Sequence, residues 1–267
     1  MTDPLERTRV CLSIAGSDSG GGAGIQADLK AFAAAGVHGT TAITAITAQN
    51  TLAVVAVAAV SPEMIVAQVR AVVDDLGVDA VKVGMLGTVA SAEAVGEALS
   101  LLPAGTPVVV DPVMVAESGG RLLDAGAQDA LVRHVIRRAT VVTPNLPEAR
   151  VLAGDDTLEG EALARAVHAL GPRAVVVTGG HRAEAVDVLF DGERVTELPG
   201  PRHPDGAAHG SGCTHSSTLA ARLALGDDLE AAAREAKRVA AEAVRNGLRD
   251  VGAGAGPVDA LAIRRQL

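Results

Sequence analysis

The chain has 267 residues, of which 48% are hydrophobic and 21% charged, a composition that suits one large α/β domain. Its formal net charge of −9 argues against a general affinity for nucleic acid, and two Phe with no Tyr or Trp leave no platform for stacking bases. The two cysteines show no metal-ligand spacing, and no stretch has the pattern of a signal peptide or the length of an apolar membrane span. We therefore expect a cytoplasmic protein with no nucleic-acid or membrane partner.

Short β-branched segments alternate with Ala-rich amphipathic segments along almost the whole chain. Strands are predicted at residues 9–16, 39–48, 52–60, 79–84, 107–111, 139–143 and 173–180. Residues 185–190 and 193–199, joined through Asp191-Gly192, predict a β-hairpin. Helices are predicted at about residues 23–36, 62–76, 88–102, 121–138, 158–170, 213–225 and 228–248. This alternation predicts a single α/β domain, residues 1–267, with a mostly parallel sheet covered by helices on both faces.

Polar and glycine-rich segments follow the predicted strands at their carboxyl ends. The first strand is followed by "GSDSGGGAG", the second by "AQNT", and later strands by "GML", "DPVM", "TPNLPEA" and "GGH". Ligands of open parallel sheets bind beyond the carboxyl ends of the strands. We therefore expect the functional site at this edge of the sheet.

The segment "HGSGCTHSS" places Cys213 at the start of an apolar helix, behind the turn Gly210-Ser211-Gly212. Backbone N–H groups in the first turn of a helix have no intrahelical partner, and the helix dipole favours negative charge there. The position predicts a lowered pKa for the thiol and a docking place for an anion. The alternative is that Cys213 is a small residue that fills a helix–strand junction.

The sequence contains neither the G-x-x-x-x-G-K-[ST] motif nor G-x-G-x-x-G, which excludes these two nucleotide-binding signatures. It does contain two glycine-rich turns, residues 20–24 and 210–212, together with acidic residues Asp111 and Glu148 at strand ends. An anion-binding turn, a base and carboxylates that can hold Mg²⁺ suit phosphoryl transfer. Asp111 as a turn residue before Pro112, and Glu148 as a first-turn helix carboxylate, remain the alternative interpretations.

These segments together resemble a known family. "AGSDSGGGAGIQADLK", "TAQNT", "GML", "DPVM", "TPNLPEA", "GGH" and "HGSGCT" are similar, in this order, to the hydroxymethylpyrimidine/phosphomethylpyrimidine kinases of thiamine biosynthesis, within the ribokinase-like superfamily. The resemblance covers about residues 9–250. It implies a ribokinase-like fold, a homodimer, and phosphorylation of 4-amino-5-hydroxymethyl-2-methylpyrimidine and then its monophosphate, with ATP as phosphoryl donor and Mg²⁺ as cofactor.

The resemblance also implies roles for individual residues. Cys213 matches the base that takes the substrate hydroxyl proton, and the turn of Gly210, Ser211 and Gly212 matches the anion hole. The matching substrate-binding residues are Gly16, Asp28, Gln49, Met85 and Val113. The matching nucleotide-binding residues are Asn145, Thr178, Gly180 and Thr214, and the metal positions are Asp111, Thr143 and Glu148. His209 is interpreted as structural support for the cysteine turn.

Some of these positions have structural alternatives or depart from the family. Asp28 could be an ordinary helix-face carboxylate, Gln49 a polar strand end and Met85 simple packing. Thr178 stands where many members of the family have Lys, which removes one positive charge from the expected nucleotide site. The glycine-containing segment 115–123 is a candidate flap.

Three other functions are considered. A pyridoxal or pyridoxine kinase uses the same scaffold and, in some relatives, the same cysteine, but Gln49 argues against it. A non-catalytic sensor that binds the pyrimidine is disfavoured by the presence of Cys213, Asp111 and Glu148 together. A thiol oxidoreductase would need a resolving cysteine, and Cys11 lies inside the first predicted strand.

Overall fold

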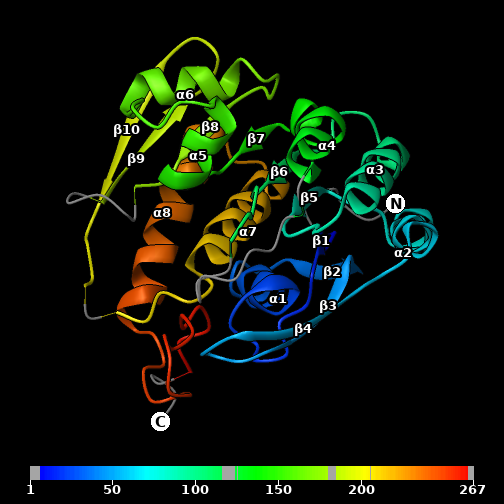
Figure 1. Ribbon diagram of the computed structural model, residues 1–267, viewed down its shortest axis with the longest axis horizontal. Coiled ribbons are helices and arrows are strands. Elements are labelled where there is room, and N and C mark those ends of the chain that lie inside the picture. Colours follow the sequence, from blue (N-terminus) through cyan, green and yellow to red (C-terminus); the bar gives the residue numbers. More distant parts are fainter. Residues whose placement is uncertain (1–6, 116–123, 125, 180–184, 205, 264–267) are drawn as a thin grey trace.

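The computed structural model describes residues 7–263 apart from 116–123, 125, 180–184 and 205. Eight strands form a central sheet in the order β10-β9-β8-β7-β6-β5-β1-β2 (Figure 1). Neighbours from β8 to β2 are parallel, whereas β9 pairs antiparallel with both β8 and β10. The predicted class, a single α/β domain with a mostly parallel sheet, is confirmed. Within the described ranges, every helix is too short or too polar to traverse a lipid bilayer.

The strands of the central sheet are short, and most of their residues are apolar, with valine the most frequent. Their bounds are β1 (Val10–Ala15), β2 (His38–Ile43), β5 (Ala80–Val83), β6 (Val108–Val110), β7 (Val141–Val142), β8 (Val175–Val177), β9 (Ala185–Phe190) and β10 (Val195–Gly200). Residues of β1, β5, β6, β7 and β8 are all buried, as expected for strands covered on both faces. The predicted hairpin is present as β9 and β10, with Phe190 opposite Val195.

The predicted strand at 39–48 is wrong as a single element, because the chain leaves the central sheet at Thr44. There the Thr44 backbone N–H donates to Ala15 O, and the Thr44 hydroxyl donates to Met85 O at 2.7 Å. The following residues form β3 (Ala45–Gln49), which pairs only with β4 (Val54–Ala59) in a separate antiparallel sheet. The β-branched residues on both sides of Thr44 hid this break from the sequence pattern.

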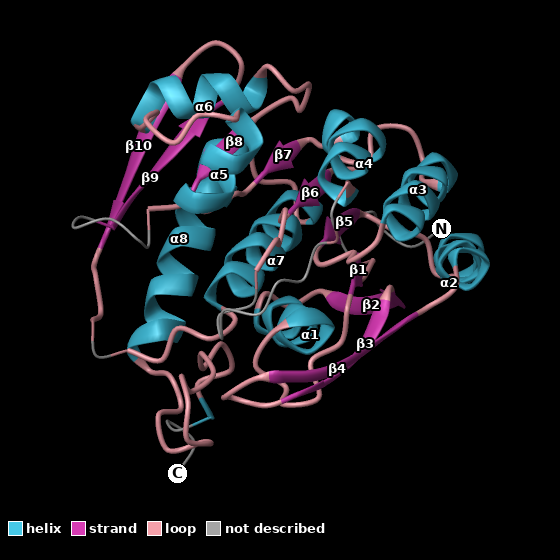
Figure 2. Ribbon diagram, viewed as in Figure 1, coloured by secondary structure: helices cyan, strands magenta, loops and turns pink. Residues whose placement is uncertain are grey.

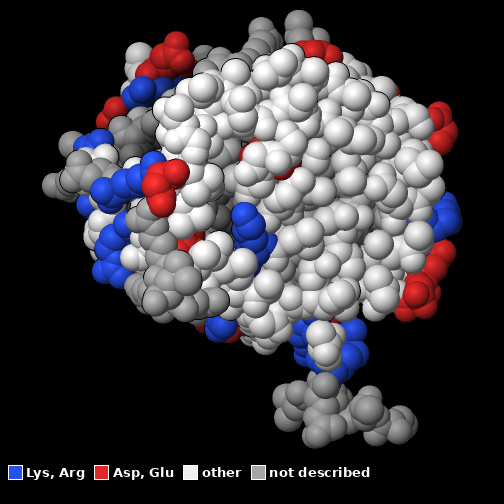
Figure 3. Space-filling view, turned by 90° about the horizontal axis from the view of Figure 1, so that it is seen from below, with Lys and Arg blue, Asp and Glu red and all other residues white. Residues whose placement is uncertain are grey.

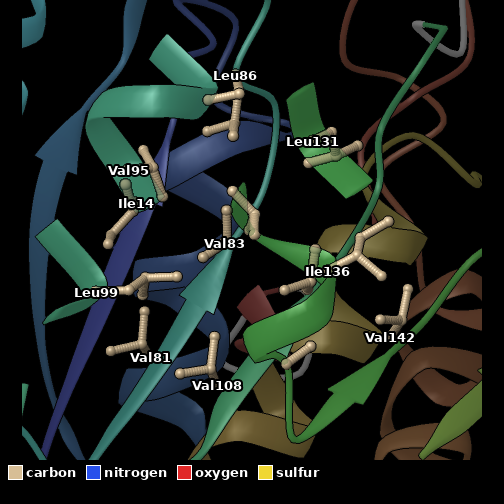
Figure 4. Close-up of a cluster of buried hydrophobic side chains, with 14 of the residues drawn as sticks. Ile14, Val81, Val83, Leu86, Val95, Leu99, Val108, Leu131, Ile136 and Val142 are labelled. Atoms are coloured by element: carbon tan, nitrogen blue, oxygen red, sulfur yellow. The ribbon is translucent and has the colours of Figure 1, made fainter. Parts of the chain in front are cut away.

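Alternate residues along the strands face two separate helix layers. On one face, strand residues such as Ile14, Val83 and Val110 pack against five helices. These are α2 (Pro62–Asp75), α3 (Val89–Ala98), α4 (Ala127–His134), α5 (Leu146–Ala153) and α6 (Gly160–His168). Figure 4 shows part of this core, where Leu99 and Ile136 lie beside the strand valines.

The other face of the sheet is covered by α1 (Gly24–Ala34), α7 (Ser211–Ala224) and α8 (Leu229–Arg245) (Figure 2). Cys11 of β1 and Val109 of β6 pack here with Phe32 of α1 and Leu219 of α7. Helix α7 lies between α1 and α8 and crosses the central strands, so its position determines where its first turn meets the edge of the sheet.

Most predicted helices are present with shorter ends, but α5 was missed. Helix α5 has only eight residues and carries Pro147 in its first turn, so its apolar periodicity is weak. Its start is determined by a capping box, in which the Asn145 side chain accepts from the Glu148 N–H and the Glu148 carboxylate accepts from the Asn145 N–H. Helix α7 begins at Ser211 rather than 213. The predicted helix start at 121 lies outside the described residues.

Replacement of Leu219 tests whether the second helix layer anchors α7. Leu219 is fully buried between α7 and the sheet, so Leu219→Ala is expected to lower the free energy of unfolding by about 2–5 kcal/mol. Urea denaturation measures this loss. Leu225→Ala is the control, because Leu225 is 39% exposed at the end of the same helix and should cost less than about 1 kcal/mol. Equal losses in the two variants would contradict this view of the core.

Candidate active site

A cavity of about 470 Å³ lies at the carboxyl ends of the parallel strands. Gly16 follows β1, Met85 follows β5, Asp111 follows β6, Thr143 follows β7 and Thr178 follows β8. The predicted site residues that line the cavity are Gly16, Gln49, Met85, Asp111, Val113, Thr143, Asn145, Glu148, Thr178, Gly210, Ser211, Gly212 and Cys213. Topology thus brings segments far apart in the sequence to one edge of the sheet.

Two of the predicted site residues that the structure describes do not line the cavity. Asp28 is fully buried beneath it, on the inner face of α1. Thr214 follows Cys213 by one position, which turns its side chain to the buried side of α7, where it is 1% exposed. Its hydroxyl has no hydrogen-bond partner among the described residues. Gly180 lies outside the described residues, as does almost all of the candidate flap 115–123.

One end of the cavity is lined by Gly16, Met85 and Val113, and its polar group is the side-chain amide of Gln49. Gly16 leaves room for Met85, because a Cβ at position 16 would lie 2.6 Å from the Met85 methyl carbon. Val113 lines the wall as a half-buried side chain. Gln49, at the end of β3, accepts a long hydrogen bond of 3.4 Å from the Thr47 hydroxyl through Oε1. Its amide N–H group has no partner among the described residues, so it can donate to a ligand.

The glycine-rich loop 18–24 is organised by Asp18, a residue that the sequence reasoning did not identify. The Asp18 carboxylate accepts from the N–H groups of Gly20, Gly22 and Ala23 at 2.8–3.0 Å and lies 3.0 Å from His209 Nε2. Burial acts to raise the pKa of Asp18, but the His209 contact and these N–H groups outweigh it and lower the pKa. These three N–H groups therefore serve the loop itself rather than a bound anion.

The cysteine turn is pressed directly against this loop. Gly210 is the N-cap of α7 with a φ of 84°, and a Cβ there would overlap the Gly22 carbonyl oxygen. Only glycine meets both demands. The Ser211 N–H donates to Ala208 O, whereas the N–H groups of Gly212 and Cys213 have no partner within the part of the chain that the structure describes. Two backbone donors at a helix N-terminus thus remain available to an anion.

The predicted low pKa of Cys213 is wrong. Burial raises the pKa of this thiol to about 12, and the carboxylates of Asp28 and Asp111 add to the increase. Lys82 and the Gly24 N–H act in the opposite direction without reversing it. The helix N-terminus is present, but desolvation and neighbouring negative charge outweigh its effect on the thiol.

Asp28 holds a buried lysine instead of facing a ligand. Its two carboxylate oxygens lie 2.8 and 3.0 Å from Lys82 Nζ, and they also accept from the hydroxyls of Ser13 and Ser217. Lys82, which the sequence reasoning missed inside an apolar strand, lines the cavity floor. The geometry therefore gives no support to the expected contact between Asp28 and a ligand, because its carboxylate oxygens are already engaged.

Two carboxylates, Asp111 and Glu148, share one wall of the cavity. Burial and the Asp111 charge raise the pKa of Glu148 to about 8, although the N–H groups of Asn145 and Met114 act to lower it. Burial likewise raises the pKa of Asp111, which accepts from the Ser216 hydroxyl. The described residues contain no group of three or more His, Cys, Asp or Glu side chains arranged for a metal. Two crowded carboxylates nevertheless fit Mg²⁺, which takes few protein oxygens and keeps several other oxygen ligands.

The far wall of the cavity contains charged residues that no motif indicated. Asp187 of β9 accepts from the Gly179 N–H at 2.7 Å and lies 2.6 Å from Lys237 Nζ of α8. His215 Nε2 lies 3.5 Å from the same carboxylate. Burial acts to raise the pKa of Asp187, but His215, Lys237 and the N–H group outweigh it and lower the pKa. Lys237 sits within a regular amphipathic helix, so only the fold places it beside Asp187, whose carboxylate also accepts from the Gly179 N–H.

Comparison with known proteins identifies the family. The family described as "Phosphomethylpyrimidine kinase" matches residues 18–259. The chain belongs to this phosphotransferase family. A hydroxymethylpyrimidine/phosphomethylpyrimidine kinase of Rhizobium meliloti is 48% identical over 94% of this chain and 96% of its own length. The matched residues 18–259 span the glycine-rich loop, the carboxylates Asp111 and Glu148, and the cysteine turn described above.

Solved structures show the same fold in kinases of this kind. The pyridoxal kinase from Staphylococcus aureus in complex with AMP-PCP and pyridoxal has a TM-score of 0.86 at 32% identity, over 97% of this chain and 96% of that one. Phosphomethylpyrimidine kinase from Clostridium difficile has a TM-score of 0.76 at 39% identity, over 86% of this chain and 96% of that one. The ribokinase-like fold expected from the sequence is thereby confirmed.

The raised pKa of Cys213 can be tested by alkylation of the empty enzyme. With a pKa of about 12, Cys213 should react with iodoacetamide at pH 8 roughly a thousandfold more slowly than free cysteine. The rate should increase about tenfold per pH unit up to about pH 10. Peptide mass spectrometry assigns the modified site and separates Cys213 from the fully buried Cys11. A rate that is already constant with pH near pH 7 would instead indicate a stable thiolate.

Proposed function

We propose that this enzyme phosphorylates 4-amino-5-hydroxymethyl-2-methylpyrimidine and then its monophosphate in thiamine biosynthesis, with ATP as donor. The observation that carries the proposal is one cavity in which a selective apolar pocket, a cysteine with free backbone N–H groups and two carboxylates meet. The names of the most similar relatives support it, since they are hydroxymethylpyrimidine/phosphomethylpyrimidine kinases. Free thiols and ATP also suit the reducing cytoplasm in which we place the protein.

The apolar end of the cavity is the proposed place of the pyrimidine ring. Met85 and Val113 contact the ring, and Gly16 allows its close approach to the backbone. The free amide of Gln49 donates to a ring nitrogen, while its carbonyl oxygen accepts from the exocyclic amino group. A buried amide left without a partner would disfavour rings that lack these groups.

Phosphoryl transfer is proposed between this pocket and the first turn of α7. The hydroxymethyl oxygen attacks the γ-phosphorus of ATP, a new O–P bond forms, and the bond to the ADP oxygen breaks. The N–H groups of Gly212 and Cys213 donate to the oxygens of the transferred group, and the Gly210 turn holds them in place. Asp111 and Glu148, with Thr143 beside them, would hold Mg²⁺, which supplies charge neutralisation for the phosphates.

Cys213 is proposed to accept the proton of the attacking hydroxyl. With its raised pKa, the thiol is protonated at neutral pH. Burial and the carboxylates of Asp28 and Asp111 together raise this pKa, so a cation bound at Asp111 would remove one of these causes and make Cys213 a better base. The proposal thus links ionisation of the thiol to assembly of the complete site.

The nucleotide is proposed to bind along the wall that contains Asn145 and Thr178. Lys237 lies on this wall and is held by Asp187. The family resemblance also places Gly180 and Thr214 at the nucleotide. The buried Thr214 side chain gives no support to this role, and Gly180 lies outside the described residues. We propose that Lys237 offsets the absence of a lysine at position 178.

Pyridoxal kinase is the second candidate function. The observation that favours it is the close structural match to the S. aureus pyridoxal kinase, including its complex with pyridoxal. The two activities share the phosphoryl-transfer machinery, so only the ring pocket separates them. Gln49 is the residue expected to make the distinction.

A coupled kinase assay with MgATP tests both functions side by side. Hydroxymethylpyrimidine and its monophosphate should be phosphorylated with kcat/KM well above that for pyridoxal. Cys213→Ala should reduce kcat about 10²–10⁴-fold with little change in KM, because it removes the base and not the binding pocket. Faster turnover of pyridoxal would refute the assignment of Gln49. Binding of the pyrimidine without its phosphorylation would contradict the kinase function and favour a non-catalytic sensor.

We also propose that the protein forms a homodimer through β3 and β4. Residues 45–59 contain no charged side chain, and every residue of β4 except Val54 is exposed. Ile46, Val55 and Val57 are 56%, 74% and 53% exposed. The underside of the molecule, where these strands lie in Figure 1, shows a broad and largely uncharged face (Figure 3). A two-stranded sheet is marginally stable alone, and an uncharged edge strand of this kind suits a second copy related by two-fold symmetry.

Val57→Asp tests the proposed dimer surface. The wild-type protein should sediment as a dimer in analytical ultracentrifugation, and Val57→Asp should shift it towards monomer by burying an unpaired charge. Val151→Asp on α5 is the matched control, because Val151 is also exposed but lies away from β4. A wild-type monomer at all concentrations, or equal dissociation of both variants, would contradict this surface.

A further inference from the structure

Beneath the cysteine turn lies an ion pair that is completely shielded from solvent. Lys82 of β5 and Asp28 of α1 are both 0% exposed, with Nζ 2.8 Å from Oδ1 and 3.0 Å from Oδ2. Ser13 of β1 donates to Oδ2 at 2.6 Å, and Ser217 of α7 donates to Oδ1 at 2.7 Å. The pair therefore connects two strands and two helices at the floor of the cavity.

Removing the two charges of an ion pair from water costs free energy. The presence of the Lys82–Asp28 pair beside the proposed reacting groups therefore suggests that it has a function. Replacing such a pair by apolar residues of similar volume is often neutral or stabilising in other proteins. The hydroxyls of Ser13 and Ser217 hold the Asp28 carboxylate, which in turn holds the lysine ammonium. Gly84 also makes room for it, because a Cβ at position 84 would lie 2.7 Å from Lys82 Nζ.

The ammonium of Lys82 acts on the reacting end of the cavity. Lys82 and Cys213 border the same cavity, and Ser217, one turn after Cys213 on α7, donates to the Asp28 carboxylate that holds Lys82. The charge of Lys82 is therefore close enough to act on Cys213 and Asp111 as well as on Asp28. Burial disfavours the charged form, but Asp28, Cys213 and Asp111 together raise the pKa of Lys82 above its ordinary value. Lys82 is therefore a permanent positive charge. The other charged groups that act on Cys213 are the carboxylates of Asp28 and Asp111, which are negative.

We propose that Lys82 is the fixed cation that stabilises the thiolate of Cys213 and the negative charge of phosphoryl transfer, and that Asp28 is its positioning residue. Asp28 holds Nζ at one place under the cysteine turn, so the field at the thiol is preorganised. Because Asp28 is negative, it also limits the effect of Lys82 on the thiol. The two members of the pair thus act on Cys213 with opposite sign. The catalytic part of this inference rests on the proposed function, whereas the effect on the thiol does not.

Alkylation of the enzyme without added ligands tests whether Lys82 and Asp28 have opposite effects on the reactivity of the Cys213 thiol. At about pH 9.5, Lys82→Met should lower the rate of Cys213 alkylation by iodoacetamide about tenfold, and Asp28→Asn should raise it about tenfold. A purely structural role would loosen the cavity floor in both variants and shift both rates in the same direction. Arg222→Met and Asp227→Asn are matched controls, since this pair is also on or beside α7 but lies at the surface, and both should leave the rate unchanged. Equal or parallel shifts in the two test variants would overturn the proposal.

A double variant keeps the test decisive if Lys82→Met does not fold. Lys82→Met combined with Asp28→Asn leaves no unpaired buried charge. Its alkylation rate should lie between those of the two single variants, and its kcat should be at least about tenfold below wild type with KM changed less than about threefold. A double variant with wild-type kcat would overturn the catalytic role of Lys82. If the wild type phosphorylated neither pyrimidine nor pyridoxal, the proposed function would fall, while opposite alkylation shifts would still support the action of Lys82 on the thiol.

Discussion

The contact between the loop after β1 and the first turn of α7 is the constraint on which the site depends. Gly210 adopts a left-handed conformation against the Gly22 carbonyl, and His209 next to it reaches Asp18 at the centre of the glycine loop. With the two turns locked together, the N–H groups of Gly212 and Cys213 face the cavity. A side chain at Gly22 or Gly210 would separate the turns and displace these donors.

Negative charge dominates the chemistry of the cavity. Asp28, Asp111 and Glu148 all lie at or below its floor and wall, and burial makes each of their charges costly. Asp28 is paired with Lys82, whereas the Asp111 charge raises the pKa of Glu148, and these two carboxylates are suited to a divalent cation. Burial and the nearby carboxylates of Asp28 and Asp111 also explain why Cys213 has a high rather than a low pKa although it lies at a helix N-terminus.

Much of the architecture could be predicted from the sequence, because it follows from local patterns. Runs such as Val108–Val110 are short, apolar and β-branched, and the amphipathic segments between them have a helical period. The strand ends with their polar motifs were therefore correctly assigned to one edge of the sheet. The errors occurred where a local pattern was ambiguous: the β-branched stretch across Thr44 concealed a change of sheet, and the short helix α5 was missed beside its proline.

The sequence by itself determined the fold class, the family and thirteen of the residues that line the cavity, since periodicity and compact motifs are properties of neighbouring residues. Only the tertiary structure decided the role of Asp28, which a motif places near the ligand and the fold places under the floor with Lys82. It also decided the pKa of Cys213 and brought Asp187 and Lys237 together from different elements. These features depend on burial and on charges contributed by residues distant in the chain, and such quantities exist only once the chain is folded.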